Sequence, residues 1–74
     1  MSNDLIFLCM KRASLLFGGK DGVFNSASFS HAFRDFTQTD VVLDGRSVEV
    51  ILCGRSDVRP LKGGAHWRLV EETN

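Results

Sequence analysis

The sequence lacks a net charge, because nine Lys and Arg residues balance nine Asp and Glu residues among its 74 residues. A protein whose main partner is nucleic acid usually has a basic excess, and an anionic membrane surface favours the same excess. Neutrality therefore argues against both partners as first choices. It also removes the repulsion that keeps copies of a chain apart, so a homodimer is an expected alternative to a monomer.

The sequence also lacks a long apolar run. The longest continuous one, residues 5–10, has Asp4 before it and Lys11 and Arg12 after it. A secretory signal needs positive charge before its apolar segment, and a membrane-spanning helix needs about 20 apolar residues. We therefore predict neither a signal peptide nor a transmembrane helix, and we expect a cytoplasmic location.

Cysteine is scarce, and Cys9 and Cys53 are too few for a disulfide framework. Both have apolar neighbours, so we expect two buried, reduced thiols. The two histidines, His31 and His66, are as widely spaced as the cysteines. Zinc sites normally supply their ligands as close pairs, so no metal is predicted. The Gly-rich stretches 18–22 and 62–64 do not match a phosphate-binding loop either, and no cofactor is predicted.

The pattern predicts one α+β domain over residues 1–74, with a polar tail at 72–74. We expect an antiparallel sheet of three to five strands packed on one Phe-rich amphipathic helix over residues 26–38. Asn25 or Ser26 should begin that helix. Its apolar residues recur at i, i+3, i+4 and i+7, and they are Phe29, Ala32, Phe33 and Phe36.

Residues 4–17 fit two structures. As a helix they have an apolar face with a 3.6-residue period, a candidate N-cap at Ser2 and a Gly18-Gly19 terminus. As strands, the continuous apolar run suits a segment buried on both faces. We favour the strand, which gives the element order ββαβββ, whereas the helix gives ααβββ.

The Asp44-Gly45 pair predicts a β-hairpin. It lies between the apolar segments 41–43 and 47–52, and Asp-Gly suits a two-residue type I′ turn. The resulting register sets Asp40 opposite Glu49, which is unfavourable unless a cation lies nearby. Residues 65–71 alternate like a third strand, and we expect its Arg68 to supply that cation.

Residues 53–67, CGRSDVRPLKGGAHW, hold the only Pro, the only Trp and three cations. Arg beside Trp is a composition typical of binding hot spots, although a solvated loop with the Trp buried in the core would also explain it. The candidate binding residues are the cations of residues 53–68 and the His-Trp pair between them: Arg55, Arg59, Lys62, His66, Trp67 and Arg68.

These observations favour a small non-enzymatic protein-binding module, an adaptor or inhibitor that docks on a larger protein partner. Small proteins of this kind often come from phages and other mobile elements. The alternative is a nucleic-acid-binding protein that uses the basic loop and strand at residues 55–68. A third hypothesis is a thiol–imidazole catalytic or ligand site around Cys53 and His66. A domain of this size has little room for a substrate pocket, so we predict that it is not an enzyme.

Overall fold

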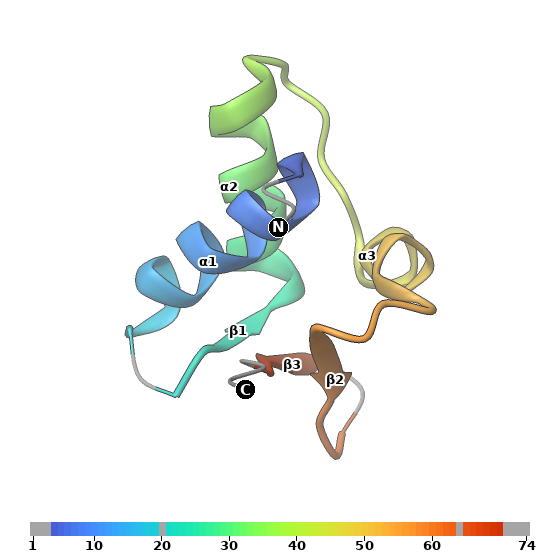
Figure 1. Ribbon diagram of the computed structural model, residues 1–74. Helices are drawn as coiled ribbons and strands as arrows, with labels where there is room; N and C mark the ends of the chain where they lie inside the picture. Colours follow the sequence, from blue (N-terminus) through green and yellow to red (C-terminus); the bar gives the residue numbers. More distant parts are fainter. Residues whose placement is uncertain (1–3, 20, 64, 71–74) are drawn as a thin grey trace.

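The computed structural model describes residues 4–19, 21–63 and 65–70. This part of the chain forms three helices and a three-stranded antiparallel sheet, which confirms the α+β class (Figure 1). In chain order the elements are α1 (Leu5–Phe17), β1 (Val23–Asn25), α2 (Ser26–Thr37), α3 (Gly45–Leu52), β2 (Val58–Pro60) and β3 (His66–Leu69).

The sheet joins segments from both halves of the chain. Its strand order is β1-β3-β2, so the C-terminal strand lies in the middle and pairs with β1 on one side and β2 on the other. Phe24 is opposite Trp67 in the first pair, and Arg59 is opposite Arg68 in the second. In Figure 1 the α1–α2 pair lies above the sheet, and α3 lies to one side beside the β2–β3 hairpin.

The N-terminal segment is a helix, so the favoured strand prediction is wrong. The Asp4 side chain accepts a hydrogen bond from the Phe7 backbone N–H at 2.7 Å, which caps the start of α1. Gly18 ends the helix at a φ of 154°, in agreement with the expected Gly-Gly terminus. Ser2, the predicted cap, lies outside the described residues. The helix has apolar side chains on two faces, but only one face is buried against the fold. The buried residues are Cys9, Met10, Ala13 and Ser14.

The predicted helix at residues 26–38 is confirmed as α2. Asn25 and Ser28 form a reciprocal capping box, which fixes its start. Phe29 and Ala32 are fully buried, but Phe36 remains 41% exposed. The expected packing of the sheet on the whole Phe stripe is therefore not confirmed. Phe29 instead stacks on Phe24 of β1 at a centroid distance of 6.0 Å.

The predicted hairpin around Asp44-Gly45 is wrong. Asp44 is the N-cap of α3, and its side chain accepts a hydrogen bond from the Ser47 backbone N–H at 2.8 Å. Residues 45–52 are helical, so Asp40 and Glu49 are not cross-strand neighbours and need no relief from Arg68. The third predicted strand is confirmed as β3, whereas β1 and β2 lie at residues where no strand was predicted. The tail at 72–74 lies outside the described residues.

The core contains residues from all six elements. Its largest fully buried side chains are Phe24, Phe29 and Met10. Cys9 is also fully buried, and burial raises the pKa of its thiol to about 11. Cys53 is exposed at the end of α3, which corrects the prediction of two buried thiols. None of the helices in the described ranges is long and apolar enough to cross a bilayer.

Gly22 should be more sensitive to substitution than Gly54, although both have a positive φ, of 69° and 83°. A Cβ at Gly22 would lie 3.1 Å from the Leu69 Cβ, whereas a Cβ at Gly54 would meet nothing within 4 Å. We expect Gly54→Ala to lower the free energy of unfolding by about 1–2 kcal/mol, because an L-residue is strained at this positive φ. Gly22→Ala should lower the free energy of unfolding by more, because its new Cβ would also crowd Leu69 of β3. Urea unfolding would measure both losses. Equal losses would contradict this assignment.

Candidate functional site

The α3 helix has one buried and one outward face. Val48 and Leu52 are buried in the core, and Ile51 packs against it. Arg46 and Glu49 point outward, together with Val50, which is 69% exposed. A short, capped helix held by one apolar stripe thus presents a mixed basic, acidic and apolar surface to solvent.

Three hydrogen bonds along the connecting segment fix the start of α3 relative to α2. The α2 helix ends at Gln38, whose left-handed backbone (φ 59°) turns the chain away while its N–H donates to the Arg34 carbonyl at 2.8 Å. The connecting segment then returns to α2, because the Leu43 N–H donates to the buried hydroxyl of Ser30 at 2.9 Å. Asp44 follows directly as the N-cap. Its carboxylate accepts a hydrogen bond from the Ser47 backbone N–H, and this hydrogen bond lowers the pKa of the carboxyl group.

An ion cluster fixes the exit from α3. The Arg55 guanidinium donates two hydrogen bonds to the Asp57 carboxylate, at 2.9 and 2.8 Å, and it also donates to Asp4 at 3.2 Å. Asp4 is the cap of α1, so the cluster joins the segment between α3 and β2 to the start of the first helix. Hydrogen bonds from Arg55 lower the pKa of Asp57, and those to Asp57 and Asp4 raise the pKa of Arg55.

Arg55 therefore has a structural role, although its sequence position suggested a binding residue. Trp67, another predicted binding residue, is only 4% exposed and stacks on Phe24 at a centroid distance of 6.0 Å. His66 is partly buried and meets the ring of Phe17 edge-on at 5.4 Å. These three residues thus make contacts within the fold, whereas the other three candidates are exposed.

The other three predicted binding residues lie together on the β2–β3 hairpin. Arg59 and Arg68 are directly opposite each other, and Lys62 is in the connecting turn; all three are exposed. Within the described ranges, no carboxylate lies within salt-bridge distance of any of them. Like charges opposite each other destabilise a strand pair, so the hairpin would gain from binding an anion.

The described residues do not support the Cys53–His66 hypothesis. Cys53 lines a hollow of about 310 Å³ beside Glu49, Arg55 and Trp67, but His66 is not among its lining residues. Asp57, the carboxylate that lies between Cys53 and His66 in the sequence, is bound by Arg55. Among the residues that the structure describes, no group of three His, Cys, Asp or Glu side chains could hold a metal ion.

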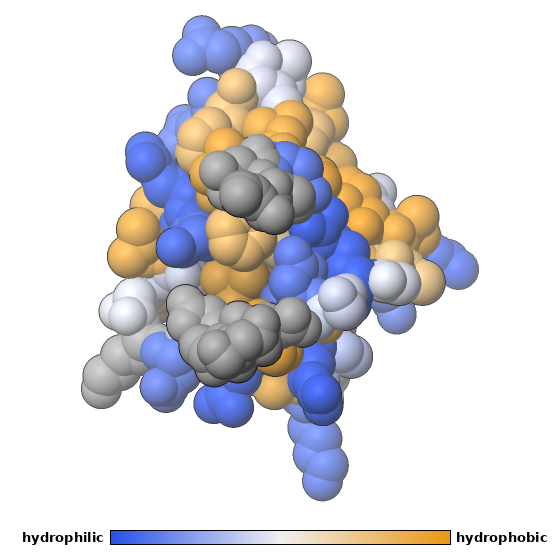
Figure 2. Space-filling model, viewed as in Figure 1, coloured by the Kyte–Doolittle hydropathy of each residue, from blue (hydrophilic) through white to orange (hydrophobic). Residues whose placement is uncertain are grey.

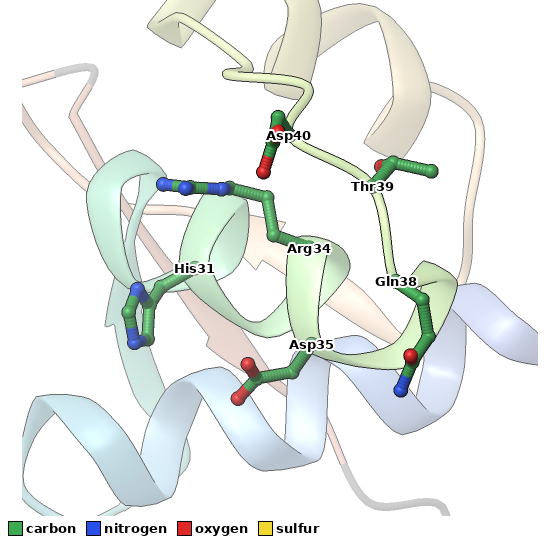
Figure 3. Close-up of a pocket in the computed structure, with 6 residues that line it drawn as sticks. All are labelled: His31, Arg34, Asp35, Gln38, Thr39 and Asp40. Atoms are coloured by element: carbon green, nitrogen blue, oxygen red, sulfur yellow. The ribbon is translucent and has the colours of Figure 1, made fainter.

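A polar hollow of about 320 Å³ lies on the outer side of α2. In Figure 3 the Arg34 side chain extends above His31, and the Asp40 carboxylate points toward it from the segment that follows the helix. The Nε atom of Arg34 is buried without a hydrogen-bond partner among the described residues. Because Asp35 and Asp40 share the hollow with Arg34, it favours neither anions nor cations, and we assign it no ligand.

Sequence reasoning missed the outward residues of α3, because it placed residues 47–52 in a strand. The signals for the helix were Asp44 followed three residues later by Ser47, and apolar residues at Val48, Ile51 and Leu52. Comparisons with protein-family models, curated proteins and solved structures found no match.

Asp57→Asn should lower the free energy of unfolding by about 1–3 kcal/mol at pH 7, because it removes charge-assisted hydrogen bonds from Arg55. The pKa of Asp57 in the folded protein is below the ordinary value of 3.8, so the ionised carboxylate stabilises the fold fully above that pH. The contribution is lost as the pH falls through the lowered pKa. The variant should therefore lose less stability than the wild type on acidification below pH 3.8.

Urea unfolding over a pH series would measure this difference. Glu49→Gln is the control, because Glu49 is exposed and makes no ion pair with any described residue. If Asp57→Asn and Glu49→Gln show the same acid dependence as the wild type, the Arg55 cluster does not stabilise the fold as described.

Proposed function

We propose that the protein is non-enzymatic and binds duplex DNA, with α3 in a groove and the β2–β3 hairpin on the neighbouring backbone. The supporting observation is the arrangement of the elements. The helices α2 and α3 follow each other in the chain and the β2–β3 hairpin comes after them, which resembles a helix-turn-helix followed by a hairpin, with a longer connection of seven residues, 38–44, between the helices. In helix-turn-helix proteins the second helix of the motif enters the major groove. Architecture does not determine function, so the chemistry must come from the side chains of α3 and of the β2–β3 hairpin.

The outward face of α3 has side chains that can contact base edges. The major groove is about 12 Å wide and admits one helix, whose N-terminal residues reach the bases. Arg46 lies in the first turn and suits guanine, which accepts two hydrogen bonds. Glu49 can accept from the cytosine amino group, and the exposed methyls of Val50 suit the thymine methyl. The mixed character of this face is thus compatible with reading a sequence.

The hairpin supplies the phosphate contacts. Arg59, Lys62 and Arg68 are exposed, and two of them repel each other across the strand pair. A phosphate group beside them would replace that repulsion with attraction. In Figure 1 the hairpin and α3 lie on the same side of the molecule, as joint contact with one duplex requires.

Net neutrality is consistent with this proposal if binding depends on few phosphates. Two of the nine acidic residues, Asp4 and Asp57, are already bound to Arg55. Asp35 and Asp40 lie on the α2 side, where they line the polar hollow. The chain therefore has a locally basic hairpin without an overall basic excess, and we expect little affinity for DNA of arbitrary sequence.

Three phosphate contacts predict that the logarithm of the DNA association constant falls with the logarithm of salt concentration with a slope of about −2.7 per chain. Affinity should then fall about 40-fold between 50 and 200 mM salt. The combined change of Arg59, Lys62 and Arg68 to Ala should remove most of this slope. Fluorescence anisotropy with a library of labelled duplexes would measure it.

Lys11→Ala is the matched control for that variant, because Lys11 is an exposed cation on α1 and should leave the slope unchanged. Arg46→Ala should instead reduce discrimination between duplex sequences, by about 1–3 kcal/mol at the position that it reads. The proposal is wrong if the wild type binds no duplex at low salt, or if the Lys11→Ala variant lowers the slope as much as the triple variant.

A second candidate function is docking on a larger protein partner, which the sequence alone favoured. The observation behind it is an apolar surface around α3: Val41, Val42 and Val50 are 48%, 74% and 69% exposed. A hollow of about 530 Å³ beside Val50 is lined by the apolar residues Leu43, Val50 and Ile51 and also by Asp44, Arg46 and Ser47. Figure 2 shows apolar surface on this side of the molecule. Such a surface suits an apolar side chain of a partner better than it suits phosphate.

If docking is the function, Val42→Glu should reduce capture of the partner by tenfold or more, because a carboxylate would be buried at the interface. Affinity capture from the native cell, followed by titration of the identified partner, would measure this. Leu15→Glu is the matched control, since Leu15 is 67% exposed on α1, away from this surface. Equal capture by the Val42→Glu and wild-type proteins would exclude the valine surface as the docking site.

A further inference from the structure

We propose that two copies of the chain associate through the outward faces of α1 and the end of α2, forming a twofold symmetric dimer. The outward face of α1 has four leucines exposed to between 38% and 67%: Leu5, Leu8, Leu15 and Leu16. The opposite face of the same helix is buried in the core. A helix with apolar side chains on two opposite faces normally has a partner on each face, and the described residues leave this outward face uncovered.

The spacing of the outward residues indicates another helix as the partner. Leu5, Leu8, Arg12 and Leu15 follow one another at intervals of three, four and three residues. This alternation is the 3.5-residue period with which one helix packs along another, and a single polar residue in such a seam specifies the register. The core of this chain does not require that period, because its own contacts with α1 are made by the other face.

The apolar surface continues onto α2. Phe36 is 41% exposed, and the Arg12 guanidinium lies 6.0 Å from the centre of its ring. The same guanidinium lies 3.6 Å from the Asp35 carboxylate, and both side chains are about half exposed. We call this surface the α1 patch: Leu5, Leu8, Arg12, Leu15, Leu16, Asp35 and Phe36.

The helical seam of the α1 patch and the neutrality of the chain indicate a second copy of this chain as its occupant. A twofold axis makes residue i of one copy meet residue j of the other, and j meet i. With antiparallel α1 helices, Leu5 would meet Leu15 of the other copy, and the Arg12–Asp35 pairs would lie near the axis. Each Arg12 could then exchange or share its Asp35 partner across the interface. Lys11 is also exposed on α1, so each copy brings two cations and one anion near the axis, while the chain as a whole has no net charge that would resist self-association.

The dimension of the molecule suits this arrangement. Helix-turn-helix dimers place their recognition helices one DNA turn apart, about 34 Å. The principal extents of the chain are 37 × 29 × 24 Å, so two copies in contact have centres separated by a comparable distance. In Figure 1 the C-terminal end of α1 lies away from α3, whereas its first turn is joined through Asp4 to Arg55, so contact through the C-terminal half of α1 would leave α3 free. This step alone rests on the proposed DNA-binding function; the dimer does not.

The dimer should be weak. A standard interface buries about 800 Å² on each partner, which would be roughly a sixth of the 5074 Å² surface of the chain. The α1 helix has 13 residues and is about 20 Å long, so the α1 patch is smaller than that. We therefore expect a dissociation constant in the micromolar range.

Sedimentation equilibrium of the free protein up to about 200 µM, well above such a constant, tests the proposal. We expect the wild type to dimerise, and Leu15→Glu to raise the dissociation constant by about tenfold or more. Ala27→Glu is the matched control, since Ala27 is exposed in the first turn of α2, at the other end of that helix from Asp35 and Phe36. Both variants replace exposed residues and should fold, which circular dichroism would verify.

Charge reversal tests the role of the ion pair. Arg12→Asp and Asp35→Arg should each weaken dimerisation, and the double variant should restore it. A wild type that stays monomeric at about 200 µM overturns the proposal. So does an Ala27→Glu variant whose dimerisation is weakened as much as that of Leu15→Glu.

No DNA is present in the sedimentation experiment. A monomeric wild type would therefore contradict the dimer and leave the DNA-binding proposal untouched. Fluorescence anisotropy with the Leu15→Glu variant then tests that function separately, since a monomer retains its hairpin cations and should retain the salt slope. A chain that dimerises but binds no duplex would contradict the proposed function alone.

Discussion

The stacked rings of Phe29, Phe24 and Trp67 hold the two halves of this protein together. Phe29 belongs to α2, Phe24 to β1 and Trp67 to β3, and the centroid distances along the stack are both 6.0 Å. All three side chains are nearly or fully buried. In a chain of 74 residues the core is small, so each large side chain contributes a large share of the burial. The β2–β3 hairpin is attached to the helices chiefly through this stack and the strand pairing around it.

Polar contacts then orient what the stack attaches. The Ser30–Leu43 hydrogen bond and the Asp44 cap set the beginning of α3, and the Arg55 cluster sets the segment that leaves it. These contacts lie at the two ends of a helix of eight residues, which leaves its outward face free of packing. The fold thus holds both ends of α3 and leaves the outward face between them exposed to solvent. The proposed DNA contacts depend on that exposed face.

The elements that could be predicted from sequence are those with one consistent signal. The α2 helix has apolar residues at a helical period, and β3 alternates around Trp67. By contrast, Asp44-Gly45 has two meanings, because Asp-Gly suits a tight hairpin turn and Asp also suits a helix N-cap. The choice depends on Ser47 and on the spacing after it. The α1 helix was misjudged because apolar residues on both of its faces look like a strand buried on both sides.

The candidate site divides in the same way. Arg59, Lys62 and Arg68 could be selected from sequence because an excess of local charge does not depend on the type of element. Which side chains of residues 45–52 point outward does depend on it, since a helix and a strand expose different positions. The pairing of Arg55 with Asp4 joins residues 51 positions apart, and no local pattern predicts such a contact.

The different environments of the two cysteines have a practical consequence. Cys9 is fully buried, and its thiol, with a pKa of about 11, stays protonated and unreactive at neutral pH. Cys53 is exposed at the last turn of α3. The unmodified protein therefore offers one accessible thiol for a fluorescent or paramagnetic probe, next to the surface where α3 would meet its partner. Binding at that surface could be observed without any substitution in the chain.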